Sequence, residues 1–191
     1  MERLATKEEI KIGNSTVMTK RVVFLIAFED FRDQEYFVPK EILEKGGVKV
    51  KTASTKKGIA LGADGGDTNV DLILEEINLV DFDAIIFIGG PGCLEYLDNE
   101  KSYQIAQKAL VENKFLAAIC ISPVILAKAG VLKGRKVTVW TSALDKGPVK
   151  ILNDNGAEFI NEKIVQDGNI ITANGPAAAE AFGKKILENL T

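Results

Sequence analysis

Residues 115–124 read FLAAICISPV, an apolar run that stops at a cysteine and continues at once into a Ser-Pro pair. The run 115–119 has the composition of a short buried strand. Ser122 is a favoured N-cap residue and Pro123 a favoured first residue of a helix. A strand that turns into a helix this quickly forms a tight elbow that exposes a nucleophile. The stretch therefore predicts a strand, an elbow at Cys120 and a helix, although a buried structural cysteine fits the same local pattern.

The same alternation of short apolar runs and amphipathic segments extends outward from this elbow in both directions. It predicts an α/β fold: a single-domain, flavodoxin-like sandwich whose mostly parallel sheet has helices on both faces. We expect this domain to span residues 21–191, with residues 1–20 forming an appended arm or small hairpin. The Asp-Gly pair at 167–168 predicts a hairpin over 163–172. The expected strands are 21–27, 48–54, 83–88, 115–119 and 136–140, a further short hairpin lies around 69–74, and the expected helices are 34–45, 101–112, 122–129, 143–155 and one from residue 176.

The composition excludes several classes of function. A net charge of −3 does not favour binding to nucleic acid or to an anionic membrane, and the apolar runs are too short to span a bilayer. Two cysteines make no disulfide framework, so we expect a cytoplasmic location. The chain has no histidine, which excludes Cys-His and Ser-His catalytic pairs and imidazole metal sites within it. No metal or organic cofactor is expected.

Three features follow the carboxyl ends of predicted strands, the edge at which open parallel sheets bind ligands. They are the acidic segment 28–35, the GGPG turn at 89–92, and Cys120. A thiol at a helix N-terminus is expected to have a lowered pKa. Backbone N–H groups of the GGPG turn could hold an oxyanion, although the segment also fits a plain tight turn.

The acidic segment offers four candidates for a proton-transferring partner of the thiol, and the sequence pattern alone does not choose between them. A carboxyl beside a thiolate does not easily ionise as well, so such a pair would hold one proton between them. Cys93, next to GGPG, could resolve an oxidised Cys120 or be an ordinary loop cysteine. Trp140 could line the pocket or belong to the core. The four acids are Glu29, Asp30, Asp33 and Glu35.

Four segments in order give the chain a resemblance to the ThiJ/PfpI superfamily, whose fold is that of the class I glutamine amidotransferases. The segment from residue 27 to 54 resembles its first strand-helix-strand unit, and FDAIIFIGGPG resembles its oxyanion-loop strand. AAICISPVILAKAGVLKGRKVT resembles its nucleophile elbow, and the segment from residue 165 to 190 its closing hairpin and helix. The superfamily contains the Parkinson-disease-associated glyoxalase/deglycase, archaeal intracellular proteases and bacterial stress proteins.

The resemblance assigns roles to individual residues. It implies that Cys120 is the nucleophile and Glu35 its partner, the latter marked by Pro39 four residues later. It also implies backbone oxyanion donors at Gly90 and Ile121. The substrate-binding candidates beside these are Gly89 and Trp140. Protease-like members carry histidine where this chain has Ile121, so peptide hydrolysis is disfavoured.

The expected function is accordingly a glyoxalase III or deglycase-like action on small reactive aldehydes such as methylglyoxal, in a stress-response setting. Glu35 would shuttle the proton. The alternative is a redox sensor or stress-response binding protein in which Cys120 oxidises and little catalysis occurs, and a cysteine protease or amidase ranks third. The expected partners are a small aldehyde or glycated substrate and further copies of the chain in a homodimer or larger oligomer, without nucleic acid or membrane.

Overall fold

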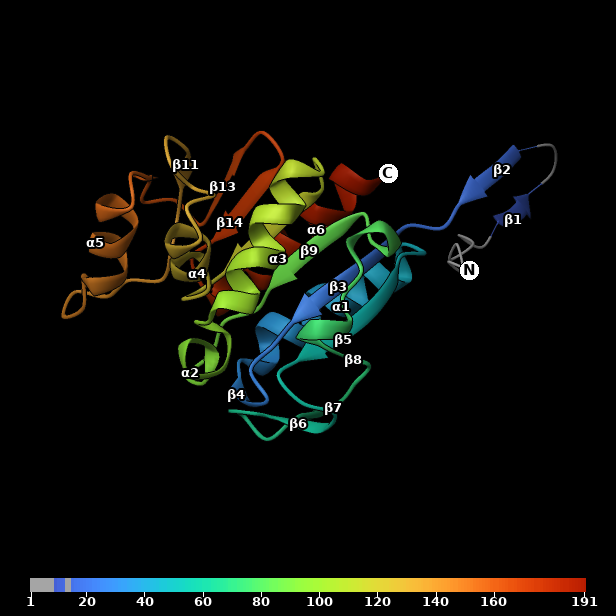
Figure 1. Ribbon diagram of the computed structural model, residues 1–191, viewed down its shortest axis with the longest axis horizontal. Helices are drawn as coiled ribbons and strands as arrows, with labels where there is room; N and C mark the ends of the chain where they lie inside the picture. The colour runs from blue at the N-terminus through green and yellow to red at the C-terminus, as the bar shows by residue number, and fades with distance from the viewer. Residues whose placement is uncertain (1–8, 13–14) are drawn as a thin grey trace.

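A seven-stranded sheet forms the centre of the computed structural model, which describes residues 9–12 and 15–191 (Figure 1). Its strands lie in the order β13-β14-β10-β9-β3-β5-β8, and every neighbouring pair is parallel except β13 and β14. The predicted, mostly parallel α/β architecture is confirmed. The strands are β3 (Arg21–Leu25), β5 (Lys49–Ser54), β8 (Leu72–Ile73), β9 (Ala84–Phe87), β10 (Phe115–Ile119), β13 (Ile164–Asp167) and β14 (Ile170–Ala173).

Helices cover both faces of the sheet, and β3 shows why. Its side chains alternate, so Val22 and Phe24 enter the core under α1 (Asp33–Lys45) and α6 (Ala179–Leu190). Val23 and Leu25 enter the opposite core, under α2 (Cys93–Leu97), α3 (Glu100–Val111) and α4 (Pro123–Lys128). A strand buried on both faces reads as a continuous apolar run, and this explains the sequence RVVFL.

The C-terminal third departs from the predicted elements in two places. The segment 136–140 was expected to be a full strand, but β11 covers only Lys136–Val137 and pairs with β12 (Glu158–Phe159), outside the main sheet. The helix expected over 143–155 is the shorter α5 (Gly147–Asp154), and Pro148 lies in its first turn. Pro176 opens a short 3-10 turn, η3 (Pro176–Ala178), ahead of α6.

The hairpin that follows β5 spans residues 58–70 and turns at 63–66, so the prediction of a hairpin around 69–74 is wrong. Strands β6 (Gly58–Gly62) and β7 (Asp67–Val70) form it, and β4 (Glu29–Phe31) adds a third strand. The Asp33 carboxylate accepts hydrogen bonds from the N–H groups of Asp64 (2.9 Å) and Gly66 (2.6 Å). The Asp64-Gly65 pair at this turn is the same kind of signal as the one that predicts the 163–172 hairpin, but the hairpin was expected further along the chain.

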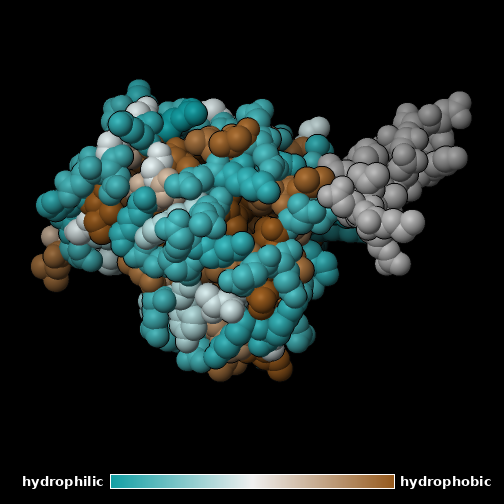
Figure 2. All heavy atoms as spheres, in the orientation of Figure 1, coloured by the Kyte–Doolittle hydropathy of each residue, from teal (hydrophilic) through white to brown (hydrophobic). Residues whose placement is uncertain are grey.

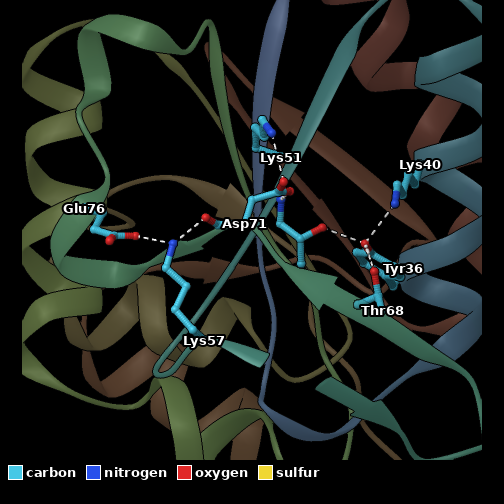
Figure 3. A network of polar contacts seen from close by, with 8 residues as sticks. Tyr36, Lys40, Lys51, Lys57, Thr68, Asp71 and Glu76 are labelled. Carbon is cyan, nitrogen blue, oxygen red and sulfur yellow. Dashed lines mark hydrogen bonds and ion pairs between the residues drawn. The ribbon is translucent and has the colours of Figure 1, made fainter. Parts of the chain in front are cut away.

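A polar network ties the N-terminal half of α1 to the sheet (Figure 3). The Tyr36 hydroxyl is buried and hydrogen bonds with Thr52 (2.6 Å) and Thr68 (2.9 Å). Asp71 accepts from the Thr52 N–H (2.8 Å) and pairs with Lys51, which extends the network. The network fixes the turn of α1 that also carries the neighbouring Glu35.

Pro39 lies at the seventh residue of α1, beyond the first turn, in which helices tolerate proline. A proline inside a helix has no N–H for the carbonyl four residues earlier, which here belongs to Glu35. The helix nevertheless continues to Lys45.

Near the N-terminus of the described chain, β1 (Glu9–Ile12) and β2 (Ser15–Met18) pair as antiparallel strands. The division at residue 20 stays a prediction.

The surface seen in Figure 2 is mostly hydrophilic, with apolar side chains exposed in small groups. The large exposed ones come from separate elements, including Ile59 and Leu61 of β6, Val111 of α3 and Leu144. Among the described residues, no helix is both long and apolar enough to cross a membrane.

Candidate active site

Cys120 occupies a strained turn directly after β10. Its φ is +65°, a left-handed conformation that non-glycine residues rarely adopt. Two hydrogen bonds hold it there: its N–H donates to the Ala173 carbonyl (2.8 Å), and its carbonyl accepts from the Trp140 N–H (2.7 Å). Backbone strain held by such contacts is common where a side chain must be presented to a ligand. The predicted strand-elbow-helix unit is therefore present at this sequence position.

Ser122 supports the elbow differently from the expected N-cap. It stands at the N-cap position of α4, but its side chain makes no capping hydrogen bond. Its buried Oγ instead lies within hydrogen-bond distance of the Phe87 carbonyl (2.8 Å), the Ile119 carbonyl (2.8 Å) and the Ile119 N–H (3.0 Å). Ser122 thus fastens the elbow to the ends of β9 and β10.

Of the four acids considered, Glu35 is the one whose carboxyl lies next to the Cys120 thiol. It lies in the first turn of α1 and its residue is 0% exposed. Burial raises the pKa of its carboxyl from 4.5 to about 7, while the Cys120 thiol, the Arg32 charge and the Gly89 N–H pull the other way. Within the described chain, neither carboxyl oxygen of Glu35 makes a well-formed hydrogen bond. A carboxyl in this setting readily takes and releases a proton near neutral pH.

The thiol itself does not have the lowered pKa that its place before a helix led us to expect. Burial raises the pKa of Cys120, and the adjacent Glu35 carboxyl raises it further. The backbone N–H groups of Ile121 and Gly90 act on the sulfur in the opposite direction, but they are outweighed. Since α4 has only six residues, its dipole is short. Cys120 and Glu35 therefore hold two protons between them below about pH 7 and one proton above it.

The GGPG segment packs against β4 more closely than any side chain would allow. Arg32 N–H donates to the Gly89 carbonyl (3.1 Å), and Gly92 N–H to the Asp30 carbonyl (3.1 Å). A Cβ on Gly90, whose φ is +122°, would lie 2.4 Å from the Arg32 nitrogen. These contacts bring the Gly90 N–H to the sulfur, beside that of Ile121.

A cavity of about 330 Å³ opens over Cys120 at the carboxyl ends of the strands. Trp140 lines it although it belongs to no strand, and Gly89 lies behind Cys120, outside the wall. Sequence reasoning missed Arg32 because only the acids of its segment were weighed, and Pro176 because the end of β14 was not searched as the other strand ends were. The lining residues are Arg32, Gly90, Pro91, Leu94, Cys120, Ile121, Trp140 and Pro176.

Cys93 is not the loop cysteine that the sequence predicted. It begins α2, is 0% exposed and packs in the core, and burial raises its pKa well above the ordinary value. In the described part of the chain, no group of three or more His, Cys, Asp or Glu side chains could hold a metal ion.

We expect Gly89→Ala to disrupt the site. The added Cβ would lie 2.6 Å from the Cys120 Cβ, 2.7 Å from Glu35 Oε2 and 2.8 Å from the Ile119 carbonyl. Overpacking of this kind costs about 1–3 kcal/mol of unfolding free energy, and it pushes the thiol and carboxyl apart. Thermal unfolding and the alkylation rate of Cys120 measure both effects.

Gly134→Ala is the matched control, because Gly134 has open space around its Cβ position and a φ of +73°. Gly134→Ala should lower the unfolding free energy only through the strain of an alanine at this φ, and it should leave the alkylation rate of Cys120 unchanged. A Gly89→Ala protein with wild-type stability and a wild-type alkylation rate would contradict the packing argument.

Comparison with known proteins identifies the family of this chain. The sequence model of the DJ-1/PfpI family matches residues 20–189. The deglycase PfpI of Pyrococcus furiosus is 36% identical over 89% of this chain and 99% of its own length. An uncharacterized protein of Methanocaldococcus jannaschii is 39% identical over 88% of this chain and 81% of its own. The crystal structure of a ThiJ/PfpI domain protein from Brachyspira murdochii superposes with a TM-score of 0.84 at 34% identity, covering 89% of this chain and 95% of that one. The chain therefore belongs to the DJ-1/PfpI family.

Proposed function

We propose that this protein acts on small reactive aldehydes such as methylglyoxal, as a glyoxalase III or deglycase-like enzyme. One observation carries the proposal: a thiol on a strained elbow lines a cavity, and beside that thiol lies a buried carboxyl, outside the cavity wall, whose pKa is about 7. Several relatives, including that of Pyrococcus furiosus, are named deglycases, which supports carbonyl chemistry at this site.

The first step is the addition of the thiol to the aldehyde. With one proton between the pair, the Glu35 carboxylate takes the thiol proton while the sulfur attacks the aldehyde carbon. A C–S bond forms, and the π electrons of the carbonyl move to oxygen. The Gly90 and Ile121 N–H groups stabilise that charge. Glu35 then returns the proton to the oxygen, which gives a hemithioacetal.

The second step is a proton transfer between carbons. Glu35 removes the hydrogen of the hemithioacetal carbon as a proton, leaving its electron pair in an enediol, and delivers the proton to the neighbouring carbonyl carbon. The proton of the hemithioacetal hydroxyl moves to the oxygen of that neighbouring carbon. The carbon bonded to sulfur is thereby oxidised and its neighbour reduced, giving a thioester of lactate. Water hydrolyses the thioester and restores the thiol. The net reaction is methylglyoxal plus water to lactate, without an external oxidant.

The test is lactate formation from methylglyoxal before and after the protein is alkylated with iodoacetamide. We expect lactate to form well above the rate in protein-free buffer, and the rate to fall to that background once Cys120 is alkylated, as mapped by peptide mass analysis. Lactate formation that is unaffected by complete alkylation, or no faster than buffer, would reject the proposal.

One observation also favours a second function, that of a redox sensor. The buried Glu35 carboxyl is protonated below pH 7 and has no well-formed hydrogen bond in the described chain, so it could donate to a sulfinate oxygen on Cys120. Two equivalents of peroxide would each transfer one oxygen to the sulfur and leave as water. Peroxide titration followed by intact-mass and peptide analysis tests this. Oxidation without preference for Cys120 would exclude the sensor.

A further inference from the structure

Arg32 is the one formally charged side chain in the wall of the cavity over Cys120. The rest of the wall is backbone, the thiol and apolar side chains, among them Ile121 and Trp140. Glu35 is fully buried behind this wall and does not line it. A single cation in an apolar cavity acts more strongly on a bound anion than it would in open solvent.

The guanidinium is held in place from outside the cavity. Its Nη1 donates to both carboxylate oxygens of Asp64, at 2.9 and 3.1 Å. Asp64 is in turn fixed through its own N–H, which donates to Asp33. The Arg32 backbone is fixed as well, through its hydrogen bond to Gly89. The cation is therefore oriented before any ligand arrives, which lowers the entropic cost of binding.

The ion pair leaves most of the donors of Arg32 unused. A guanidinium has five N–H donors in a fixed fork that matches a carboxylate. Among the described residues, only Nη1 makes a hydrogen bond, so Nε and Nη2 remain available. Asp64 is 52% exposed at its side chain, against 30% for Arg32, so solvent screens the acid more than the cation.

The cation is also electrostatically close to the reacting groups. Its charge acts on the Glu35 carboxyl and lowers the pKa of that group against the larger effect of burial. An anionic group held by Arg32 would therefore sit at the side of the cavity facing Glu35 and Gly89, with the rest of the molecule reaching Cys120.

We propose that Arg32 selects aldehydes that carry a carboxylate at their other end, which makes short oxo acids the preferred ligands of this site. This inference rests on the proposed carbonyl chemistry at Cys120. It adds a specificity-determining residue and a substrate class: the carboxylate pairs with the free face of the guanidinium, and the aldehyde carbon meets the sulfur.

The first test compares the rates at which iodoacetate and iodoacetamide alkylate Cys120, because the reagents differ mainly in charge. In both cases the thiolate displaces iodide, so any change in the thiol pKa affects both rates alike and cancels in their ratio. We expect Arg32→Gln to lower the iodoacetate-to-iodoacetamide ratio about tenfold, the value of one charge-assisted hydrogen bond. Arg32→Lys should retain part of the preference.

Two further variants separate recognition from a merely structural role. Asp64→Asn removes the competing carboxylate and should raise the ratio about two- to threefold. If Arg32 only held the loop in place, Arg32→Gln and Asp64→Asn would both break the ion pair and would both change the alkylation ratio in the same direction. Arg135→Gln is the matched control, since Arg135 has a similar ion pair with Asp167 (2.9 Å) at the amino end of β14. It should leave the ratio unchanged.

The second test uses aldehydes as protecting ligands. Succinic semialdehyde and butanal have equal carbon chains, and only the first carries a carboxylate. We expect succinic semialdehyde to protect Cys120 from iodoacetamide at about tenfold lower concentration than butanal, and Arg32→Gln to abolish the difference. Equal protection by both compounds, or an Arg32→Gln ratio equal to that of the wild type, would overturn the inference. These readouts need no turnover, so a protein that prefers anions but makes no lactate rejects only the proposed function.

Discussion

Cys120→Ser is expected to convert methylglyoxal to lactate at least about 10³-fold more slowly than the wild type, because no other group can form the thioester. Serine is nearly isosteric with cysteine and keeps the same backbone, including the φ of +65° at this position. The fold should therefore survive the change. Lactate assays at equal concentrations of folded protein, checked by thermal unfolding, measure the effect.

Cys93→Ala is the control for this experiment. Cys93 is the only other thiol, it is buried in the core, and it lies outside the cavity wall. Its loss should cost some stability but leave turnover within a few-fold of the wild type. Residual turnover in Cys120→Ser comparable to that of Cys93→Ala would show that the elbow thiol is not the nucleophile.

The sequence predicted the elbow because all of its determinants are local. An apolar run, a small turn and a Ser-Pro pair each act through neighbouring residues, and the strands whose carboxyl ends form the site follow the same rule. The order of these elements was enough to place Cys120 and the GGPG segment at one sheet edge, where the structure has them.

What the sequence did not predict depends on contacts between distant segments. Asp33 fixes a turn more than thirty residues away, and Ser122 bonds to the end of a different strand instead of capping its helix. The raised pKa of Cys120 arises from burial and from Glu35, neither of which can be read from the six residues of α4. Local pattern likewise left four acids open, and only the family resemblance separated Glu35 from the others.

Glu35→Gln is expected to stabilise the protein at pH 8 and to leave its stability at pH 4 almost unchanged. The carboxyl has a pKa of about 7 in the fold and 4.5 when solvated. Between these values the unfolded chain loses the proton while the folded protein keeps it, so wild-type stability falls as pH rises from about 4.5 to 7. At about 1.4 kcal/mol for each tenfold step, the loss amounts to roughly 3 kcal/mol above pH 7. Glutamine has the same shape and does not ionise, so the variant escapes this loss.

Chemical denaturation at a series of pH values measures the effect, with Glu41→Gln as the matched control on the same helix. Glu41 is 65% exposed at its side chain, so Glu41→Gln controls for the loss of one carboxyl from α1 without a change in the buried site. A difference between Glu35→Gln and wild type that stays constant from pH 4 to 8 would contradict a raised pKa at this position.

The same variant should lose turnover by about 10²–10⁴-fold, since a general base is gone. Wild-type turnover should rise with pH through about 7, because Glu35 must be ionised to take the thiol proton. A site that destabilises the fold and gains activity over the same pH range is the physical signature of a carboxyl kept buried for its chemistry.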